Sequence, residues 1–289
     1  MRIWWFRDGK AGHERQAMAL IGALRERMDV DCDELPAMPA AAALGRLLRG
    51  GFLPDLEAPD LLLGAGHATH AGLLAGRRIR GGRAVVLMKP SMPLSWFDLC
   101  VIPRHDRPPE RANVIETLGP LSPLRPAASR GRDGLLLIGG PSPHFDWDGA
   151  SLWRQIEALA RKSGRHWRLS PSRRTPAGFL EAMPAALGEH IEEVPLDEQS
   201  EGWLDETLPA AAECRVTPDS LSMIFDCLAA GVPCGVFHLD SKPGDRVSGA
   251  VTRLVEEGRV APAGSPAKAV TPLDEAGAVA NAILERWFK

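Results

Sequence analysis

Polar side chains in residues 216–237 stand where a nucleotide could be bound. Asp219, Ser222 and Asp226 follow one another at spacings of three and four, which places them on one face of a predicted helix. A helix N-terminus carries partial positive charge and unpaired N–H groups, so it attracts phosphate. Asp226, two turns further along, is placed to accept hydrogen bonds from ribose hydroxyls. In the alternative interpretation Asp219 only caps the helix and Asp226 is solvated, and spacing alone does not decide between the two.

Two glycines after a predicted strand could also approach a phosphate. Residues 135–138 are a continuous apolar run, which predicts a strand covered on both faces of a parallel sheet. The turn that follows contains Gly139, Gly140 and Ser142. Because glycine has no side chain, the backbone of this turn can come close to a diphosphate.

Two arginines after the next predicted strand form a candidate anion pocket. That strand covers residues 166–170, and Ser172, Arg173 and Arg174 follow it. Guanidinium groups bind phosphate with paired hydrogen bonds, and the Thr-Pro pair at 175–176 begins a helix that adds N–H donors. A solvated basic turn is the alternative, and the position at a strand end disfavours it.

A histidine after the first predicted strand is a candidate general base. Residues 2–6 are predicted as a strand, residues 7–13 as a loop with Gly9 and Gly12, and a helix follows. His13 therefore lies where the strand passes into the helix. Imidazole suits proton abstraction because it exchanges its proton near neutral pH. The alternative is a surface histidine that caps the helix, and the residues alone favour that alternative.

Other histidines follow other predicted strands. His67 and His70 lie after residues 61–64, and His105 and Asp106 lie after residues 99–102. Because loops after parallel strands bind ligands, we treat His105 and Asp106 as further candidates. We expect no direct role for His67 and His70.

The composition of the chain limits the class of protein. With 289 residues, 45% of them hydrophobic, and a net charge of −3, the chain fits one large or two medium globular domains and gives no sign of nucleic-acid binding. No apolar run reaches the roughly 18 residues of a membrane span, and no signal peptide follows Met1, so we expect the cytoplasm. The five cysteines lack C-x-x-C spacing and are predicted to be free thiols rather than metal ligands. The chain has no tyrosine, which excludes a catalytic phenol.

The predicted elements must bring these residues together. Strands and helices alternate in both halves of the chain, which predicts an α/β fold with two doubly wound domains. Prolines and small residues at 119–133 are typical of a linker. We therefore expect one domain at 1–120, a linker at 121–133, a second domain at 134–270, and a last helix at 271–289 capped by Thr271. A short helix is predicted at 201–212.

Four motifs make the chain resemble the ELM1 family of glycosyltransferase-like proteins, which is named after a plant mitochondrial fission factor. They are Lys-Ala-Gly-His-Glu-Arg-Gln at 10–16, Leu-Ile-Gly-Gly-Pro-Ser at 137–142, Ser-Arg-Arg-Thr-Pro at 172–176, and the segment 219–233. The chain is more distantly similar to MurG-type glycosyltransferases. The resemblance covers essentially the full chain and implies the GT-B fold: two Rossmann-like domains facing an interdomain cleft, with the last helix crossing back onto the first domain.

The resemblance implies transfer of a sugar from a nucleotide-sugar donor to a hydroxyl of a saccharide or lipid-linked acceptor, in cell-envelope saccharide synthesis. It places the acceptor on the first domain and the donor on the second. His13, beside Gly12, would deprotonate the acceptor and so lead to inversion, and Asp226 would bind the ribose. The other implied donor contacts are Gly139, Gly140, Ser142, Ser172, Arg173, Arg174, Asp219, Ser222 and Met223. No metal and no separate cofactor is implied.

The chain departs from the family pattern at several positions. Asp226 stands where glutamate is usual, Pro171 where threonine is usual, and the Asn-Pro-Tyr element expected near 201–212 is missing. Two alternatives therefore remain: a non-catalytic protein that uses the fold to bind a partner, and a nucleotide-sugar epimerase, which would need further carboxylates. Peripheral contact with the inner face of the membrane also stays open.

Overall fold

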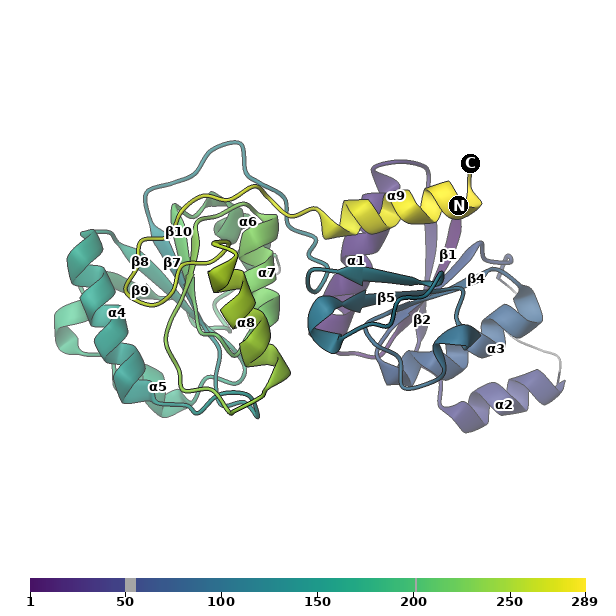
Figure 1. Ribbon diagram of the computed structural model, residues 1–289, viewed down its shortest axis with the longest axis horizontal. Coiled ribbons are helices and arrows are strands. Elements are labelled where there is room, and N and C mark those ends of the chain that lie inside the picture. The colour runs from purple at the N-terminus through teal and green to yellow at the C-terminus, as the bar shows by residue number, and fades with distance from the viewer. Residues whose placement is uncertain (50–55, 201) are drawn as a thin grey trace. The chain divides into compact units, whose positions relative to one another are not determined.

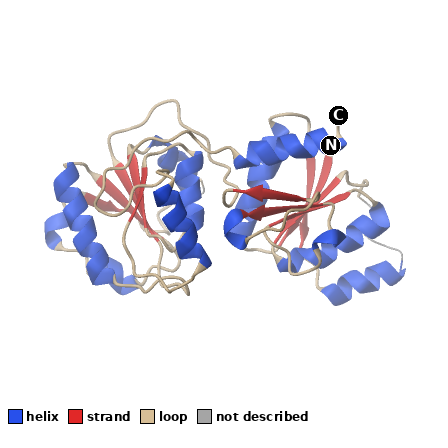
Figure 2. Ribbon diagram, viewed as in Figure 1, coloured by secondary structure: helices blue, strands red, loops and turns tan. Residues whose placement is uncertain are grey.

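The computed structural model describes residues 1–49, 56–200 and 202–289, and its elements form two compact units (Figures 1 and 2). Unit 1 contains residues 1–123 and 274–289, and unit 2 contains residues 124–273. Each unit has one sheet of parallel strands with helices between them, so the predicted α/β class is confirmed.

The sheet of unit 1 has the strand order β2-β1-β3-β4-β5-β6, with all neighbours parallel. The second strand pairs on one side of β1 and the third on the other, so the strand order reverses between β1 and β3. Such a reversal leaves a crevice at the carboxyl ends of the two strands, where doubly wound sheets bind ligands. The strands are β1 (Arg2–Arg7), β2 (Asp31–Pro36), β3 (Leu61–Ala65), β4 (Arg83–Leu87), β5 (Leu99–Pro103) and β6 (Val114–Thr117).

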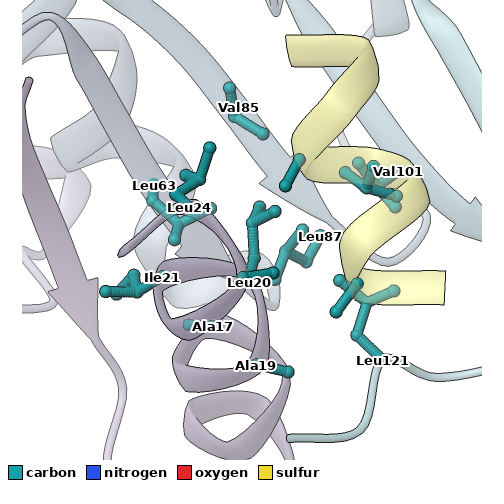
Figure 3. Packing of buried hydrophobic residues seen from close by; sticks show 14 of the residues in the cluster. Ala17, Ala19, Leu20, Ile21, Leu24, Leu63, Val85, Leu87, Val101 and Leu121 are labelled. Carbon is teal, nitrogen blue, oxygen red and sulfur yellow. The ribbon is translucent and has the colours of Figure 1, made fainter. Parts of the chain in front are cut away.

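Both faces of this sheet are buried. Alternate residues of β1 point to opposite faces: Ile3 and Trp5 join one hydrophobic cluster, and Trp4 and Phe6 join another. The first cluster lies under α1 and α9 (Figure 3), and the second includes residues of α2 and α3. This two-sided burial explains why the central strands have continuous apolar sequences. The helices are α1 (Ala11–Arg25), α2 (Ala40–Arg49), α3 (His70–Arg80) and α9 (Glu275–Trp287), with short 3-10 turns η1 (His67–Thr69), η2 (Leu94–Trp96) and η3 (Arg104–Asp106).

The last helix packs within unit 1. Ala276, Val279, Ala280 and Ile283 are buried in the same cluster as the apolar face of α1. The start predicted for this helix is wrong: α9 begins at Glu275, and its N-cap is Asp274, whose side chain accepts the N–H of Gly277. Thr271 and Pro272 precede the helix, and Leu273 N–H donates to the carbonyl of Leu228 instead of to a carbonyl of the helix.

The sheet of unit 2 has the strand order β11-β10-β7-β8-β9, again parallel throughout. Strands β8 and β9 follow on one side of β7, and β10 and β11 on the other, so the order reverses between β7 and β10. The strands are β7 (Gly134–Ile138), β8 (Trp167–Pro171), β9 (Ile191–Glu193), β10 (Glu213–Val216) and β11 (Cys234–Val236).

Helices cover both faces of this second sheet. Helices α4 and α5 lie on one side, and α6, α7 and α8 on the other (Figure 1). Side-chain caps fix two of the starts: Asp148 accepts the N–H of Ser151 at α4, and Asp245 accepts two N–H groups at α8. The bounds are α4 (Gly149–Ser163), α5 (Ala177–Glu181), η4 (Ala185–Leu187), α6 (Trp203–Ala210), α7 (Leu221–Ala229) and α8 (Arg246–Glu256).

The predicted helix at 201–212 corresponds to α6, whose first residue is Trp203; Glu201 lies outside the described residues. In the described parts of the chain, no helix is both long and apolar enough to cross a membrane.

Candidate functional site

The glycine turn after β7 is the centre of the site in unit 2. It lies at the carboxyl edge of the sheet, where the strand order reverses between β7 and β10. Gly139 N–H donates to the hydroxyl of Thr217 at 2.7 Å, and Gly140 N–H donates to Oδ2 of Asp219 at 3.1 Å. The two amides that were expected to face a diphosphate are therefore bonded to residues that follow β10.

Asp219 also explains why this turn contains glycines. A Cβ on Gly139 would overlap the Asp219 carboxylate, and a Cβ on Gly140 would overlap the backbone carbonyl of Arg174. Glycine is needed here because protein groups already occupy the space on both sides of the turn. The close approach therefore serves the internal packing of unit 2.

Asp219 is a buried anion with one close cation. Its side chain is 0% exposed, and Oδ2 lies 2.7 Å from Nη2 of Arg174, whose side chain is 44% exposed. The other carboxylate oxygen, Oδ1, is buried without a hydrogen-bond partner among the described residues. The pair ties the turn after β10 to the turn after β8 across the glycine turn between them.

The turn after β8 presents a second arginine that is not engaged. Arg173 is exposed and has no ion pair with any described residue. Thr175 fixes the turn: its hydroxyl accepts the N–H of Ser172 at 2.8 Å and donates to the carbonyl of Ile138 at 2.9 Å. Ser172 Oγ in turn accepts the N–H of Arg174 at 3.1 Å. The site therefore has one free guanidinium and one that is shared with Asp219.

The residues expected on the helix after β10 do not share one exposed face. Ser222 is exposed and Met223 is half-buried, whereas Asp226 is only 5% exposed. Asp219 precedes α7 and bonds the glycine turn, while Ser220 occupies the N-cap position without a side-chain cap bond. The second interpretation offered for this segment is therefore wrong: Asp219 does not cap the helix, and Asp226 is not solvated.

A histidine–aspartate pair that no sequence pattern predicted adjoins the glycine turn. The hydroxyl oxygen of Ser142 accepts the backbone N–H of His144 at 3.2 Å, and His144 Nδ1 lies 2.7 Å from Asp245 Oδ2. Burial alone would raise the pKa of Asp245, but hydrogen bonds from His144 and from the N–H groups of Ser248 and Val247 outweigh it and lower the pKa below its ordinary value. This pair fastens the loop after β7 to the start of α8.

In unit 1 the candidate base lies at the other reversal of strand order. His13 is in the first turn of α1, and its Nδ1 lies 2.7 Å from Oδ2 of Asp8. The Asp8 side chain is almost fully buried, at 2% exposure, and the His13 side chain is 19% exposed. A Cβ on Gly66, after β3, would overlap the His13 ring, so the imidazole lies between the ends of β1 and β3. His13 Nε2 has no hydrogen-bond partner among the described residues.

The loop that carries Asp8 is fixed by an ion pair. Glu14 Oε1 accepts the N–H of Gly9 at 3.1 Å, and Glu14 Oε2 lies 2.6 Å from Arg7 Nη2. The hydrogen bond from Arg7 lowers the pKa of Glu14 below its ordinary value. Gly9 has φ of +77°, which favours glycine, whereas a Cβ on Gly12 would meet nothing within 4 Å. Gly9 therefore keeps the loop tight, and Gly12 has no such structural role.

The remaining histidines have other environments. His70 is 1% exposed and packs edge-on against Phe97, and burial lowers its pKa. His67 is exposed. His105 Nε2 and Asp106 Oδ1 lie 3.9 Å apart, beyond hydrogen-bond distance. Asp8 is therefore better placed to orient a histidine ring than Asp106 is, and the ring that it contacts is that of His13.

Comparison with known proteins agrees with this architecture. A family model described as "Mitochondrial fission ELM1" matches residues 11–287. The chain belongs to this family. The match spans both units of the ELM1-family chain, including the glycine turn, the arginine turn and His13. None of the curated proteins matches the sequence.

Solved structures share the fold of this ELM1-family protein at low sequence identity. The UDP-GlcNAc 2-epimerase of Methanocaldococcus jannaschii matches with a TM-score of 0.57 and 14% identity, over 98% of this chain and 92% of its own. Acinetobacter baumannii MurG matches with 0.52 and 11%, over 99% and 90%. Phytolacca americana UGT2, in complex with UDP-2-fluoro-glucose and pterostilbene, matches with 0.52 and 11%, also over 99% and 90%. The fold is therefore that of the GT-B glycosyltransferases and the related epimerases.

Proposed function

We propose that this protein transfers a sugar from a nucleoside-diphosphate sugar to an acceptor hydroxyl, with the donor bound by unit 2 and His13 of unit 1 as the general base. The proposal rests on one observation: at each of the two reversals of strand order, a buried carboxylate is paired with a basic side chain. One has the buried Asp219 with Arg174 beside a glycine turn, and the other has the buried Asp8 with His13. Ligands of doubly wound sheets bind at such positions.

In this proposal, the diphosphate accepts hydrogen bonds mainly from arginine side chains and less from backbone amides. The amides of Gly139 and Gly140 already donate within the protein. Arg173 supplies an unshared guanidinium, and Arg174 supplies the donors that Asp219 and the carbonyls of Gly140 and Pro141 leave free. Hydroxyls of Ser142, Ser172 and Ser222 add weaker contacts, beside Met223, and we retain Asp226 as the group that binds the ribose.

The proposed reaction is a single displacement. His13 Nε2 takes the proton of the acceptor hydroxyl, while Asp8 holds Nδ1 so that the ring keeps the required tautomer. The acceptor oxygen attacks the anomeric carbon, and the bond from that carbon to the diphosphate oxygen breaks. The electron pair leaves with the nucleoside diphosphate, whose added charge the two arginines stabilise. Inversion of the anomeric centre follows from one displacement.

The fold relatives support a nucleotide-sugar substrate. They include enzymes of two kinds, so an experiment must distinguish sugar transfer from epimerisation. An epimerase and two glycosyltransferases are among them, and one was solved with a nucleotide-sugar analogue. Incubation with UDP-N-acetylglucosamine, followed by NMR of the sugar, distinguishes them. Transfer or hydrolysis releases UDP, whereas epimerisation changes the sugar. Binding without any turnover would favour the non-catalytic alternative.

The experiment that tests the donor site is calorimetric titration of UDP into the wild type, Arg173→Ala and Arg174→Ala. Each lost charge-assisted hydrogen bond should cost about 1.5–3 kcal/mol of binding free energy. Arg161→Ala is the matched control, because this exposed arginine of α4 has Glu157, on the same helix, as its one ion-pair partner among the described residues. Equal UDP affinity in all four proteins would refute the arginine pocket.

A second titration tests the ribose role of Asp226. UDP and its 2′,3′-dideoxy analogue should differ in affinity for the wild type, because a carboxylate that accepts ribose hydroxyls loses those bonds with the analogue. The difference should vanish in Asp226→Asn. Asp226 is buried, so unfolding of each variant must be measured alongside.

A further inference from the structure

A cavity in unit 2 lies apart from the glycine turn. Its volume is about 510 Å³, within the usual range of small-molecule sites. It is bounded by α4 on one side and by residues 263–266 on the other, and its floor is the edge of the sheet formed by β10 and β11. On this face α4 and α5 are the neighbouring helices, and α7 and α8 lie on the opposite face (Figure 1).

The floor of the cavity holds a buried charge. Glu213 and Arg215 are two residues apart on β10 and so point to the same face. Arg215 is only 4% exposed; its Nε donates to Glu213 Oε1 at 2.7 Å and its Nη2 to the carbonyl of Ser265 at 2.7 Å. The residue in register on β11 is Gly235, where a Cβ would overlap Arg215 Nη1. The guanidinium therefore lies flat on the sheet, with Nη1 over the glycine.

The walls add positive charge that the one carboxylate of the lining does not fully balance. Lys162 Nζ donates to the carbonyl of Gly264 at 3.3 Å, and Arg165 donates to the carbonyl of Arg132. Arg165 Nε is buried and has no hydrogen-bond partner among the described residues. With Arg215, the lining has three cations and one carboxylate, Glu213. A recess lined in this way attracts anions, because its low-dielectric walls focus the field.

Most of the remaining lining is apolar, apart from Gln155, Ser163 and Ser265. It includes Ala158 and Leu159 of α4, Val236 and Phe237 at the end of β11, and Ala263 and Pro266. An occupant that matches both parts of the lining has a compact anionic end and a hydrocarbon or aromatic body. Glu213 would repel a doubly charged group more strongly than a singly charged one. We propose that this cavity binds a small amphiphilic monocarboxylate, with the carboxylate beside Arg165 and Arg215.

This site is independent of the proposed donor site. Glu213 is the first residue of β10 and Arg165 precedes β8, so the cationic end lies toward the start of these strands. The glycine turn and Arg174 follow the ends of β7 and β8. None of the residues assigned to the nucleotide lines the cavity. The inference can therefore fail or succeed whatever the outcome for UDP.

Calorimetric titration with octanoate tests the proposal, with 1-octanol as the neutral ligand of similar size. We expect saturable octanoate binding that is at least about tenfold tighter than octanol binding, since a charge-assisted hydrogen bond is worth at least that factor. Ala158→Trp fills the cavity from an exposed position of α4, and Arg165→Gln removes the unpaired donor. Each should weaken octanoate binding about tenfold or more.

Two control variants keep the test specific. Ala150→Trp adds the same side chain at an exposed position near the start of α4, and Arg161→Gln removes an exposed charge beside the cavity without touching its lining. Both should bind octanoate as the wild type does. The proposal is overturned by absence of saturable binding up to about 10 mM octanoate, by unchanged binding in Ala158→Trp, or by displacement of octanoate with UDP.

Discussion

The substitution Asp8→Asn isolates the part of the proposed mechanism that depends on the orientation of His13. Asp8 Oδ2 lies 2.7 Å from His13 Nδ1, and the Asp8 side chain is 2% exposed. A carboxylate accepts hydrogen bonds only, so it holds the proton on Nδ1 and leaves Nε2 as the acceptor. An asparagine amide can instead donate to Nδ1, which moves the ring proton to Nε2 and blocks proton abstraction there.

The structure predicts a large catalytic effect with a small effect on folding. If His13 is the base, loss of the correct tautomer should cut turnover by about 10²–10⁴-fold, the usual contribution of general-base catalysis. The other contact of Asp8, the backbone N–H of Lys10 to Oδ1 at 3.2 Å, can be kept by the asparagine carbonyl. The cost to folding should therefore be one charge-assisted hydrogen bond replaced by a neutral one, about 1 kcal/mol.

The assay has two readouts. Release of UDP from a nucleotide sugar, by transfer or slow hydrolysis, reports turnover, and long-range ¹H–¹⁵N NMR of the imidazole reports which ring nitrogen of His13 carries the proton. His13→Ala is the reference for complete loss of the base, and UDP affinity should hardly change in either variant because the proposed donor residues belong to unit 2. Wild-type turnover in Asp8→Asn with the tautomer switched would refute the reasoning, because it would mean that His13 takes no proton.

Three further predictions concern packing, thiols and acid. Gly140→Ala should destabilise unit 2 by about 1–3 kcal/mol and weaken UDP binding, because its Cβ would overlap the backbone of Arg174. Gly12→Ala should leave the unfolding midpoint unchanged or raise it, because its Cβ would meet open space. Burial raises the pKa of Cys32 to about 11 and of Cys100 to about 12, so the native protein at pH 8 should react with iodoacetamide about 100-fold more slowly than the unfolded chain; equal rates would contradict this. The lowered pKa of Asp245 stabilises the folded protein at pH values above the pKa of the unfolded state, about 3.9. This contribution is lost as the pH falls through the pKa of the folded state. The gap in melting temperature between wild type and Asp245→Asn should therefore be widest near neutral pH and close below about pH 4, and a gap independent of pH would exclude a charge effect.

The elements that the sequence predicted well are those in which local pattern and burial agree. Strands β1, β3, β5 and β7 are central or buried on both faces, and each is an apolar run. The edge strands β2 and β9 were not predicted. β2 reads Asp-Cys-Asp-Glu-Leu-Pro and β9 reads Ile-Glu-Glu, because an edge strand is partly solvated and can carry charge. Their pairing is decided by the neighbouring strand, which no local pattern records.

The sequence indicated where the candidate site residues lie better than it indicated which residues they contact. The rule that ligands meet parallel sheets at strand ends singled out His13, the glycine turn and the arginines. It did not single out Asp8 and Thr217, although each directly follows a strand, because a lone aspartate or threonine there is equally typical of a turn. Asp245 is about 100 residues from His144, and the sequence gives no signal that they meet.

Asp219 shows why spacing misled the interpretation of the unit 2 site. A glycine turn beside two arginines indicates an anion site when the surrounding residues are unknown. In the fold, a carboxylate from the turn after β10 already lies against both glycines and holds one of the arginines. At the proposed donor site, a diphosphate would therefore meet one free guanidinium, that of Arg173, and would compete with a buried carboxylate for the other. Arg173→Ala should consequently affect binding alone, whereas Arg174→Ala should affect both binding and folding, because it leaves Asp219 buried without its counterion. This difference between the two variants would show that the turn is already ordered in the protein without a ligand.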